Sequence, residues 1–151
     1  MVLAHQVTVQ NLIVDAAYAA SDEEAVKRAG ERLVKAMLFS GEAQLTSPVK
    51  GTTTFATDFA GQGPRDQRGR SLRDFDLQQR LFRYPLSYLV YSASFDALPG
   101  PVKQYVYRRL REVLDGSVSE PEFSHLSAGD RAAILAIIEE TKPDFARALL
   151  R

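Results

Sequence analysis

Cysteine is absent from the 151-residue sequence, and histidine occurs only twice, at His5 and His125. Without cysteine the protein cannot form disulfides, zinc–thiolate sites, iron–sulfur clusters or a thiol nucleophile. The sequence also lacks the GK[ST] motif of phosphate-binding loops, the HExxH motif of zinc hydrolases and the GxSxG motif of serine hydrolases. Gly61-Gln62-Gly63 lacks the third glycine of a dinucleotide-binding loop. We therefore expect no cofactor, no tightly held metal and no catalytic residue, which favours a protein that is not an enzyme.

Excess charge of either sign is absent too, because 19 Lys and Arg residues balance 19 Asp and Glu residues. A domain that binds a nucleic-acid backbone is usually distinctly basic, so this balance argues against a nucleic-acid partner. Apolar residues make up 45% and charged residues 25% of the chain, which is the composition of a folded globular protein. The length is that of one ordinary domain, and we expect residues 1–151 to form a single domain.

No hydrophobic run is long enough to cross a bilayer. The N-terminal stretch MVLAHQVTVQNLIVDAAYAA is apolar, but Gln6, Gln10, Asn11 and Asp15 interrupt it and no basic leader precedes it. These features predict a folded helix rather than a signal peptide or a membrane anchor. We expect neither a targeting signal nor a membrane span in this chain. The sequence therefore does not indicate the cellular compartment.

Helical spacing of apolar residues dominates the chain, and no segment alternates as a strand. In the first expected helix, 8–20, apolar residues point nearly all round, which predicts a helix that is covered on most sides. Ser21 with Glu24, and later Ser127 with Asp130, have the spacing of helix-capping pairs. Pro101 suits the first position of a helix that stops at Gly116. The sequence therefore predicts an all-α bundle of five to seven helices, with helical segments at 8–20, 22–41, 72–83, 86–92, 101–115, 127–142 and 144–151.

Residues 42–70 contain most of the helix-breaking residues. Glycine, proline and a run of three threonines at 52–54 predict one long loop within the domain, with a short helical turn at 55–59. Loops of this length are often functional, or are held down by their own side chains, which here would be Phe55 and Phe59.

Six arginines lie in or beside this loop, in the stretch RDQRGRSLRDFDLQQRLFRYP. Ser71 with Asp74 predicts the start of a helix over 72–83, and Pro85 predicts its break. Winding that helix places Arg73, Asp76, Arg80 and Arg83 on one stripe. The stripe is interpreted first as a structural strip with internal ion pairs, and alternatively as a docking strip for an acidic partner or a phosphate site. Arg65, Arg68 and Arg70 precede the helix and could hold an anion near its N-terminus.

Three further patterns in the sequence are weaker. On a helix the carboxylates of Asp74 and Asp76 would point apart, so they could not share a metal ion. Ser124, His125 and Asp130 are the ingredients of a nucleophile relay, but their closeness in sequence favours a loop role for His125. The tyrosines fit helix–helix contacts in which the ring is buried and the hydroxyl has a partner, with base stacking as the alternative. These tyrosines are Tyr84, Tyr88, Tyr91, Tyr105 and Tyr107.

The segments GRSLRDFDLQQRLFRYPLSYLVYSASFDALPGPVKQYVYRRLREVLDG and SHLSAGDRAAILAIIEETKP carry a family resemblance. Over roughly residues 45–143 the chain resembles the C-terminal part of large, uncharacterised bacterial proteins of the cell envelope. The resemblance implies that the chain is one domain of a longer polypeptide, or related to one, and that its N-terminus packs on something outside it. No catalytic residue can be transferred from the family.

The leading hypothesis is thus a non-catalytic accessory or interaction domain that binds another protein or the rest of a parent chain. The alternative is an enzyme or a binding site for a small anion or ligand, built from the 42–70 loop with Arg65, Arg68 and Arg70. Nucleic-acid binding is third. The residues expected at a partner or anion contact are Arg65, Arg68, Arg70, Arg73, Arg80 and Arg83.

Overall fold

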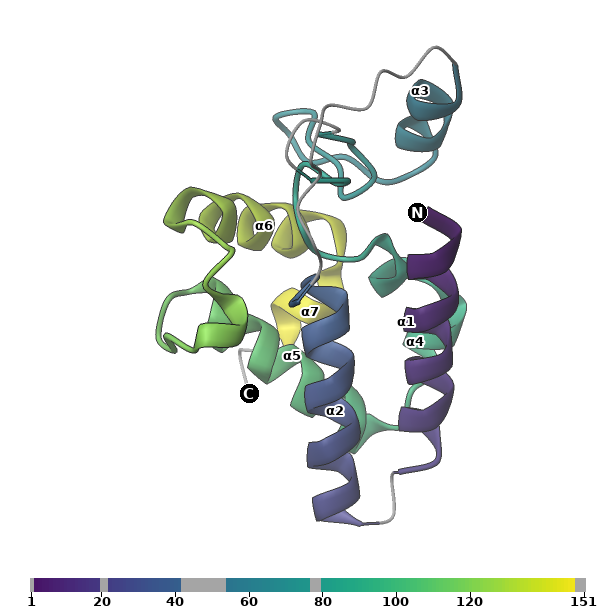
Figure 1. Cartoon of the computed structure of the whole chain (residues 1–151), viewed down its shortest axis with the longest axis vertical. Helices are drawn as coiled ribbons and strands as arrows, with labels where there is room; N and C mark the ends of the chain where they lie inside the picture. The colour runs from purple at the N-terminus through teal and green to yellow at the C-terminus, as the bar shows by residue number, and fades with distance from the viewer. Residues whose placement is uncertain (1, 20–21, 42–53, 77–79, 149–151) are drawn as a thin grey trace.

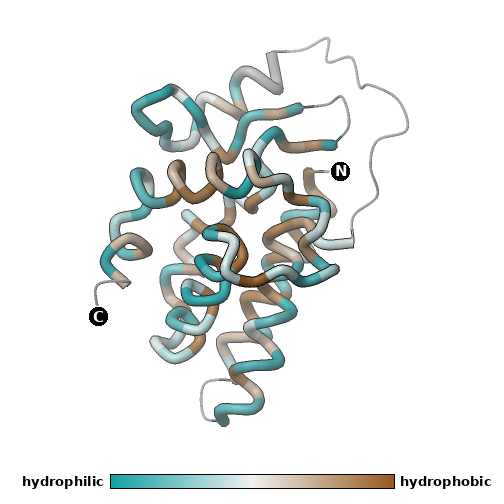
Figure 2. The backbone as a smooth tube through the Cα atoms, turned by 90° about the vertical axis from the view of Figure 1, so that its left-hand side faces the viewer, coloured by the Kyte–Doolittle hydropathy of each residue, from teal (hydrophilic) through white to brown (hydrophobic). Residues whose placement is uncertain are grey.

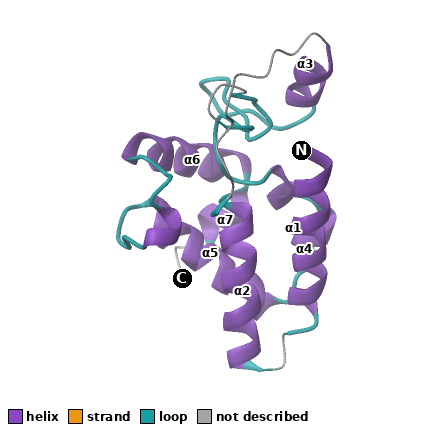
Figure 3. Cartoon of the chain, in the orientation of Figure 1, coloured by secondary structure: helices purple, strands orange, loops and turns teal. Residues whose placement is uncertain are grey.

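The computed structural model of the chain describes residues 2–19, 22–41, 54–76 and 80–148. This part contains seven α-helices and two short 3₁₀ helices and no strand, which confirms the predicted all-α bundle (Figures 1 and 3). The elements are α1 (Val2–Ala17), α2 (Glu23–Met37), α3 (Thr54–Gly61), η1 (Tyr88–Tyr91), α4 (Ala93–Asp96), α5 (Gly100–Leu114), η2 (Pro121–Phe123), α6 (Ala128–Thr141) and α7 (Pro143–Arg147).

The helices pack against one another through apolar side chains. α2 packs against both α1 and α5, α6 packs against α5 and α7, and η1 and α4 lie next to α1. Along the helices, hydrophobic and hydrophilic residues recur turn by turn, as amphipathic packing requires (Figure 2). The buried residues of the core include Ile13 of α1, Leu33 and Met37 of α2, Leu110 of α5 and Ile137 of α6.

The sequence signals for α5 and α6 are confirmed. Pro101 stands in the first turn of α5, and the chain turns away at Gly116, which has a φ of 82°. Ser127 and Asp130 form a reciprocal capping box at the start of α6. These signals act within a few residues, so the sequence alone can reveal them.

The ends of α2 differ from the prediction. Asp22 is the N-cap and accepts the amide hydrogen of Glu24, whereas the predicted cap Ser21 lies outside the described residues. The helix ends at Met37 and not near Gly41, because Phe39 takes a left-handed conformation with a φ of 60°. The amide of Ser40 donates to the carbonyl of Lys35, as in a Schellman motif, where glycine is usual at the position of Phe39. Burial of the Phe39 ring offsets the backbone strain.

The predicted helix over 72–83 is wrong. Residues 72–76 and 80–83 run antiparallel to each other, and Phe75 and Phe82 form an isolated bridge. The predicted capping pair closes a turn only, because the amide of Ser71 donates to the carboxylate of Asp74 and no helix follows. The rings of Phe75 and Phe82 stack at 5.2 Å, in contact with Phe59. Aromatic contact with a distant helix therefore decides this conformation over the local capping signal.

The rings of Phe59, Phe75 and Phe82 form an aromatic cluster that holds this hairpin-like segment on the bundle. It also contains His5, which the sequence placed in a loose terminus but which lies buried in α1. The His5 ring stacks on Phe39 at 4.2 Å, and its Nε2 lies 3.0 Å from the hydroxyl of Ser87. Because Ser87 is fully buried, this pair fastens α1 to the segment before η1 inside the core.

The second part of the predicted long loop, residues 54–70, lies within the described part of the chain. Residues 42–53 lie outside the described part of the chain, and the expected helical turn at 55–59 lies within the longer helix α3. After α3, residues 62–70 form a closed turn around the buried carboxylate of Asp66. None of the helices in the described ranges is long and apolar enough to span a bilayer.

Candidate functional site

The outer face of α1 exposes large apolar side chains. The exposed fractions are 71% for Leu3, 50% for Val7, 46% for Val14 and 85% for Tyr18, which directly follows the helix. At about 100° per residue the three positions within the helix fall within an arc of about 40°, and Tyr18 follows about one turn after Val14. We name them the outer stripe of α1. The buried residues of the helix, such as Val9 and Ile13, lie on the opposite side and pack into the core.

The sequence of α1 explains why this face stays uncharged. Asp15 is its one charged residue, whereas seven of the 15 residues of α2 are charged. The sequence predicted a helix covered on most sides, and the described residues cover only the inner side. An ordinary exposed helix carries charged side chains on its outer face, so α1 has the pattern of a helix with a second contact surface.

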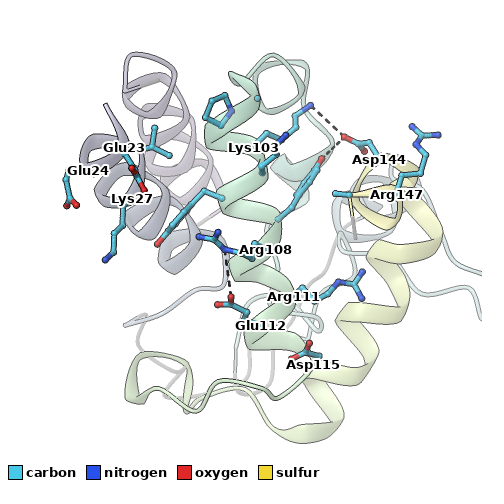
Figure 4. A pocket seen from close by; sticks show the side chains of 17 residues that line it. Glu23, Glu24, Lys27, Lys103, Arg108, Arg111, Glu112, Asp115, Asp144 and Arg147 are labelled. Carbon is cyan, nitrogen blue, oxygen red and sulfur yellow. Dashed lines mark hydrogen bonds and ion pairs between the residues drawn. The ribbon is translucent and has the colours of Figure 1, made fainter. Parts of the chain in front are cut away.

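A second candidate is an open groove of about 1370 Å³ between α2, α5 and α7 (Figure 4). Asp144 accepts a hydrogen bond from the hydroxyl of Tyr107 at 2.6 Å and lies 3.7 Å from the ammonium of Lys103. Burial alone would raise the pKa of Asp144, but the Tyr107 hydrogen bond and the nearby lysines lower it. The other lining charges are of both signs: Glu23, Glu24, Lys27, Arg108, Arg111, Glu112, Asp115 and Arg147. Because these charges offset one another, the groove does not select a ligand of either sign.

The sequence analysis missed a charged cluster around the buried Arg109. The guanidinium of Arg109 lies 2.8 Å from Glu31, 2.9 Å from Glu112 and 2.9 Å from Glu120. Burial alone would lower the pKa of Arg109, but its carboxylate partners raise it. The sequence did contain a signal that Arg109 is buried. Arg109 follows Val102 by seven residues and therefore lies on the apolar face of α5. The cluster joins α2, α5 and the segment before η2, so its role is structural.

The three arginines predicted to hold an anion contact their own chain. Arg65 donates to the carbonyls of Gly69 and Ala60 and pairs with Asp74 at 3.2 Å. The guanidinium of Arg70 pairs with the buried Asp66 at 2.7 Å. The side chain of Arg68 is exposed, while its backbone amide donates to Asp66. Two of the three guanidinium groups are therefore already committed to closing this turn.

The other three predicted arginines do not share a stripe, since the helix that would align them is absent. Arg73 lies over the rings of Phe59, at 3.8 Å, and Tyr88, at 4.7 Å. Arg83 is exposed and lies over the ring of Tyr84 at 5.6 Å. Arg80 makes a bidentate contact with Asp130, at 2.8 and 3.0 Å, which ties the hairpin-like segment to the cap of α6.

Arg80→Ala is expected to lower the free energy of unfolding by about 1–2 kcal/mol, because it leaves Asp130 without its charged partner at a half-buried site. Arg68→Ala is the matched control and is expected to change stability by less than about 0.5 kcal/mol, since that side chain is exposed. Urea unfolding of the two variants checks this. Equal stability of both would contradict the observed role of Arg80.

The remaining sequence patterns form no reaction centre. His125 lies 2.7 Å from the carbonyl of Leu38, while Asp130 is held by Arg80 and Ser127, so the suspected relay is not assembled. Among the described residues no group of three or more candidate ligands could hold a metal ion. The hydroxyl of Tyr91 lies 2.6 Å from that of Thr141, a partly buried contact of the kind expected for the tyrosines, and burial raises the pKa of Tyr91 to about 12.

The geometry defines the protein class as an all-α helical bundle with an exposed, uncharged apolar helix face. No protein-family model, curated protein or solved structure matches the chain.

Proposed function

We propose that the chain is a non-catalytic protein-interaction domain and that the outer stripe of α1 is its docking surface. The partner is another protein, or the remainder of a longer polypeptide to which the chain belongs. The proposal rests on one observation, the exposure of four large apolar side chains along one face of an almost uncharged helix.

Physical chemistry supports a protein partner for this surface. Soluble monomers rarely expose contiguous apolar patches, and those that they do expose commonly mark interaction sites. The cores of protein interfaces are depleted in charged residues and enriched in aromatic ones. Tyr18 suits the role of an anchor, since its ring is 85% exposed and its hydroxyl can reach a polar group of the partner.

The same surface is poorly suited to the other partner classes. Helices that bind membrane surfaces carry lysine and arginine beside their apolar face, and α1 has neither. Nucleic-acid binding also requires basic residues that neutralise phosphates. An anion site in the 62–70 turn would have to compete with the bonds that Arg65 and Arg70 make to their own chain.

The stability of an outer-stripe variant provides the first test. Val7→Gln/Val14→Gln is expected to leave the melting temperature within about 2 °C of the wild type, because both side chains are half exposed in the free domain. The matched control Val9→Gln, on the inner face of α1, is expected to cost about 3 kcal/mol or more, because it buries an amide in the core. If the stripe variant were as unstable as the control, the stripe would belong to the fold rather than to an interface.

The binding test uses photo-crosslinking in the cells that produce the protein. A photoreactive residue at Asn11, in the middle of the stripe, is expected to give a discrete product that the Val7→Gln/Val14→Gln change abolishes. The same residue at Arg28, exposed on α2, is the control and is expected to give no such product. Identical products at both positions, or none at Asn11, would refute the assignment of the stripe.

A further inference from the structure

The outer stripe of α1 has a palindromic spacing. Its members occupy positions 3, 7, 14 and 18, so the stripe is symmetric about a point between Gln10 and Asn11. A two-fold axis that lies beside the helix at that level, perpendicular to it, would place an antiparallel copy of α1 against the stripe. Leu3 would then lie level with Tyr18 of the copy, and Val7 level with its Val14. In that arrangement apolar side chains face apolar side chains at all four levels, as a self-complementary contact needs.

The charge pattern permits the same contact. A two-fold interface places each surface patch on itself, so a charged patch would repel its own copy. The stripe carries no charge, and Asp15 lies about a quarter-turn away from its centre. In an antiparallel pair the two Asp15 residues would be separated by about 13 Å along the helix axis, beyond the Debye length of about 8–10 Å.

The available area suits a weak dimer. With the exposed fractions given above, the four side chains leave roughly 500 Å² accessible in one copy. Two copies would then bury roughly 1,000 Å², which is the lower limit for a biological interface. α1 is an outer helix of the bundle, so a second helix can approach it side by side (Figure 1).

We propose that the outer stripe of α1 binds the same stripe of a second copy of this chain, antiparallel, in a two-fold symmetric dimer. Leu3 then contacts Tyr18 of the second copy, and Val7 contacts its Val14. The proposal rests on the proposed function of the stripe as a protein-docking surface and names the partner.

Because the chain has no cysteine, disulfide trapping can test the register directly. Val7→Cys and Val14→Cys variants are mixed in equal amounts and oxidised gently. In the antiparallel register the Val7 and Val14 positions of two copies face each other. Two Val7 positions, or two Val14 positions, lie about 10 Å apart along the axis, beyond the Cα separation of about 4.4–6.8 Å that a disulfide spans.

The expected result is a mixed 7–14 disulfide at least about tenfold more abundant than either homodimer, since only that pair meets the geometric limit. An Arg28→Cys variant provides the background from random collision. A statistical mixture of the three products would overturn the proposal, and so would a preference for 7–7 and 14–14 disulfides, which a parallel pair would produce.

Sedimentation velocity of the unmodified chain gives the independent readout. Between about 5 and 500 µM the 16.8 kDa chain is expected to pass reversibly from monomer to dimer, and Val7→Gln/Val14→Gln to weaken association at least about tenfold. A wild type that stays monomeric throughout would overturn the dimer. If the Asn11 photo-crosslink then captured a different protein, the docking function would stand; if it captured nothing, both proposals would fail.

Discussion

Gly30→Ala is expected to destabilise the protein by about 2 kcal/mol, although alanine is the better helix former by about 1 kcal/mol. Gly30 is buried in α2, where α2 packs against α5. A Cβ at this position would overlap Cδ1 of the Tyr105 ring and lie 2.8 Å from its Cε1. The ring cannot move away cheaply, because its hydroxyl interacts with Glu31 and the guanidinium of Arg108 lies over it at 5.1 Å. Thermal and urea unfolding would measure the loss.

Two variants separate steric overlap from a general effect of alanine. Gly129→Ala in α6 is the matched control, because its Cβ would meet only the Ser127 hydroxyl at 3.8 Å. It is expected to be neutral or slightly stabilising. In a Tyr105→Ala background, Gly30→Ala is expected to lose most of its cost, with a coupling energy of at least about 1 kcal/mol. A Gly30→Ala protein as stable as Gly129→Ala would contradict the close approach of α2 to Tyr105.

Asp66→Ala is expected to lower the free energy of unfolding by about 3 kcal/mol, because it removes a buried carboxylate and leaves its hydrogen-bond donors unpaired. The carboxylate of Asp66 is buried. It accepts hydrogen bonds from the backbone amides of Arg68, at 3.0 Å, and Arg70, at 2.8 Å. It also accepts a hydrogen bond from Nε of the Arg70 guanidinium at 2.7 Å. Alanine would leave these donors unpaired at the centre of the 62–70 turn. Asp66→Asn should lose less, because its amide oxygen can still accept the two backbone donors.

Asp66 also makes stability depend on acid pH. Burial alone would raise its pKa, but the hydrogen bonds from Arg70 and Arg68 lower it below the ordinary value of 3.8. A carboxylate with a depressed pKa in the folded state stabilises the protein fully above about pH 5, and this stability is lost as the pH falls through the folded pKa. The Arg80 contact lowers the pKa of Asp130 in the same direction.

Urea unfolding at a series of pH values tests this dependence. Between about pH 5 and pH 3 the wild type is expected to lose more stability than Asp66→Asn, so the difference between them narrows as acid is added. Parallel curves over that window would show that Asp66 does not have a depressed pKa. Arg68→Ala serves as the neutral control, since it keeps the carboxylate and removes only an exposed side chain.

The sequence by itself determined the elements whose signals are local. The Ser127–Asp130 capping box, Pro101 at the start of α5 and the apolar faces of α5 and α6 all act within one or two helical turns. The outer stripe was partly visible as well, because Val14 and Tyr18 belonged to a predicted helix with apolar residues nearly all round. Leu3 and Val7 were missed because that helix was expected to begin at residue 8, and α1 begins at Val2.

Only the tertiary structure decided the features that depend on distant partners. The Ser71–Asp74 signal predicted a helix, but burial of Phe75 and Phe82 against Phe59 outweighs a cap, whose contribution is about 1 kcal/mol. Arg80 was expected to pair with its own helix, and it binds Asp130, 50 residues away in sequence. Exposure of the outer stripe likewise depends on which neighbours fold over α1. Local patterns carry the small energies of caps and propensities, whereas long-range burial carries larger ones and prevails where the two conflict.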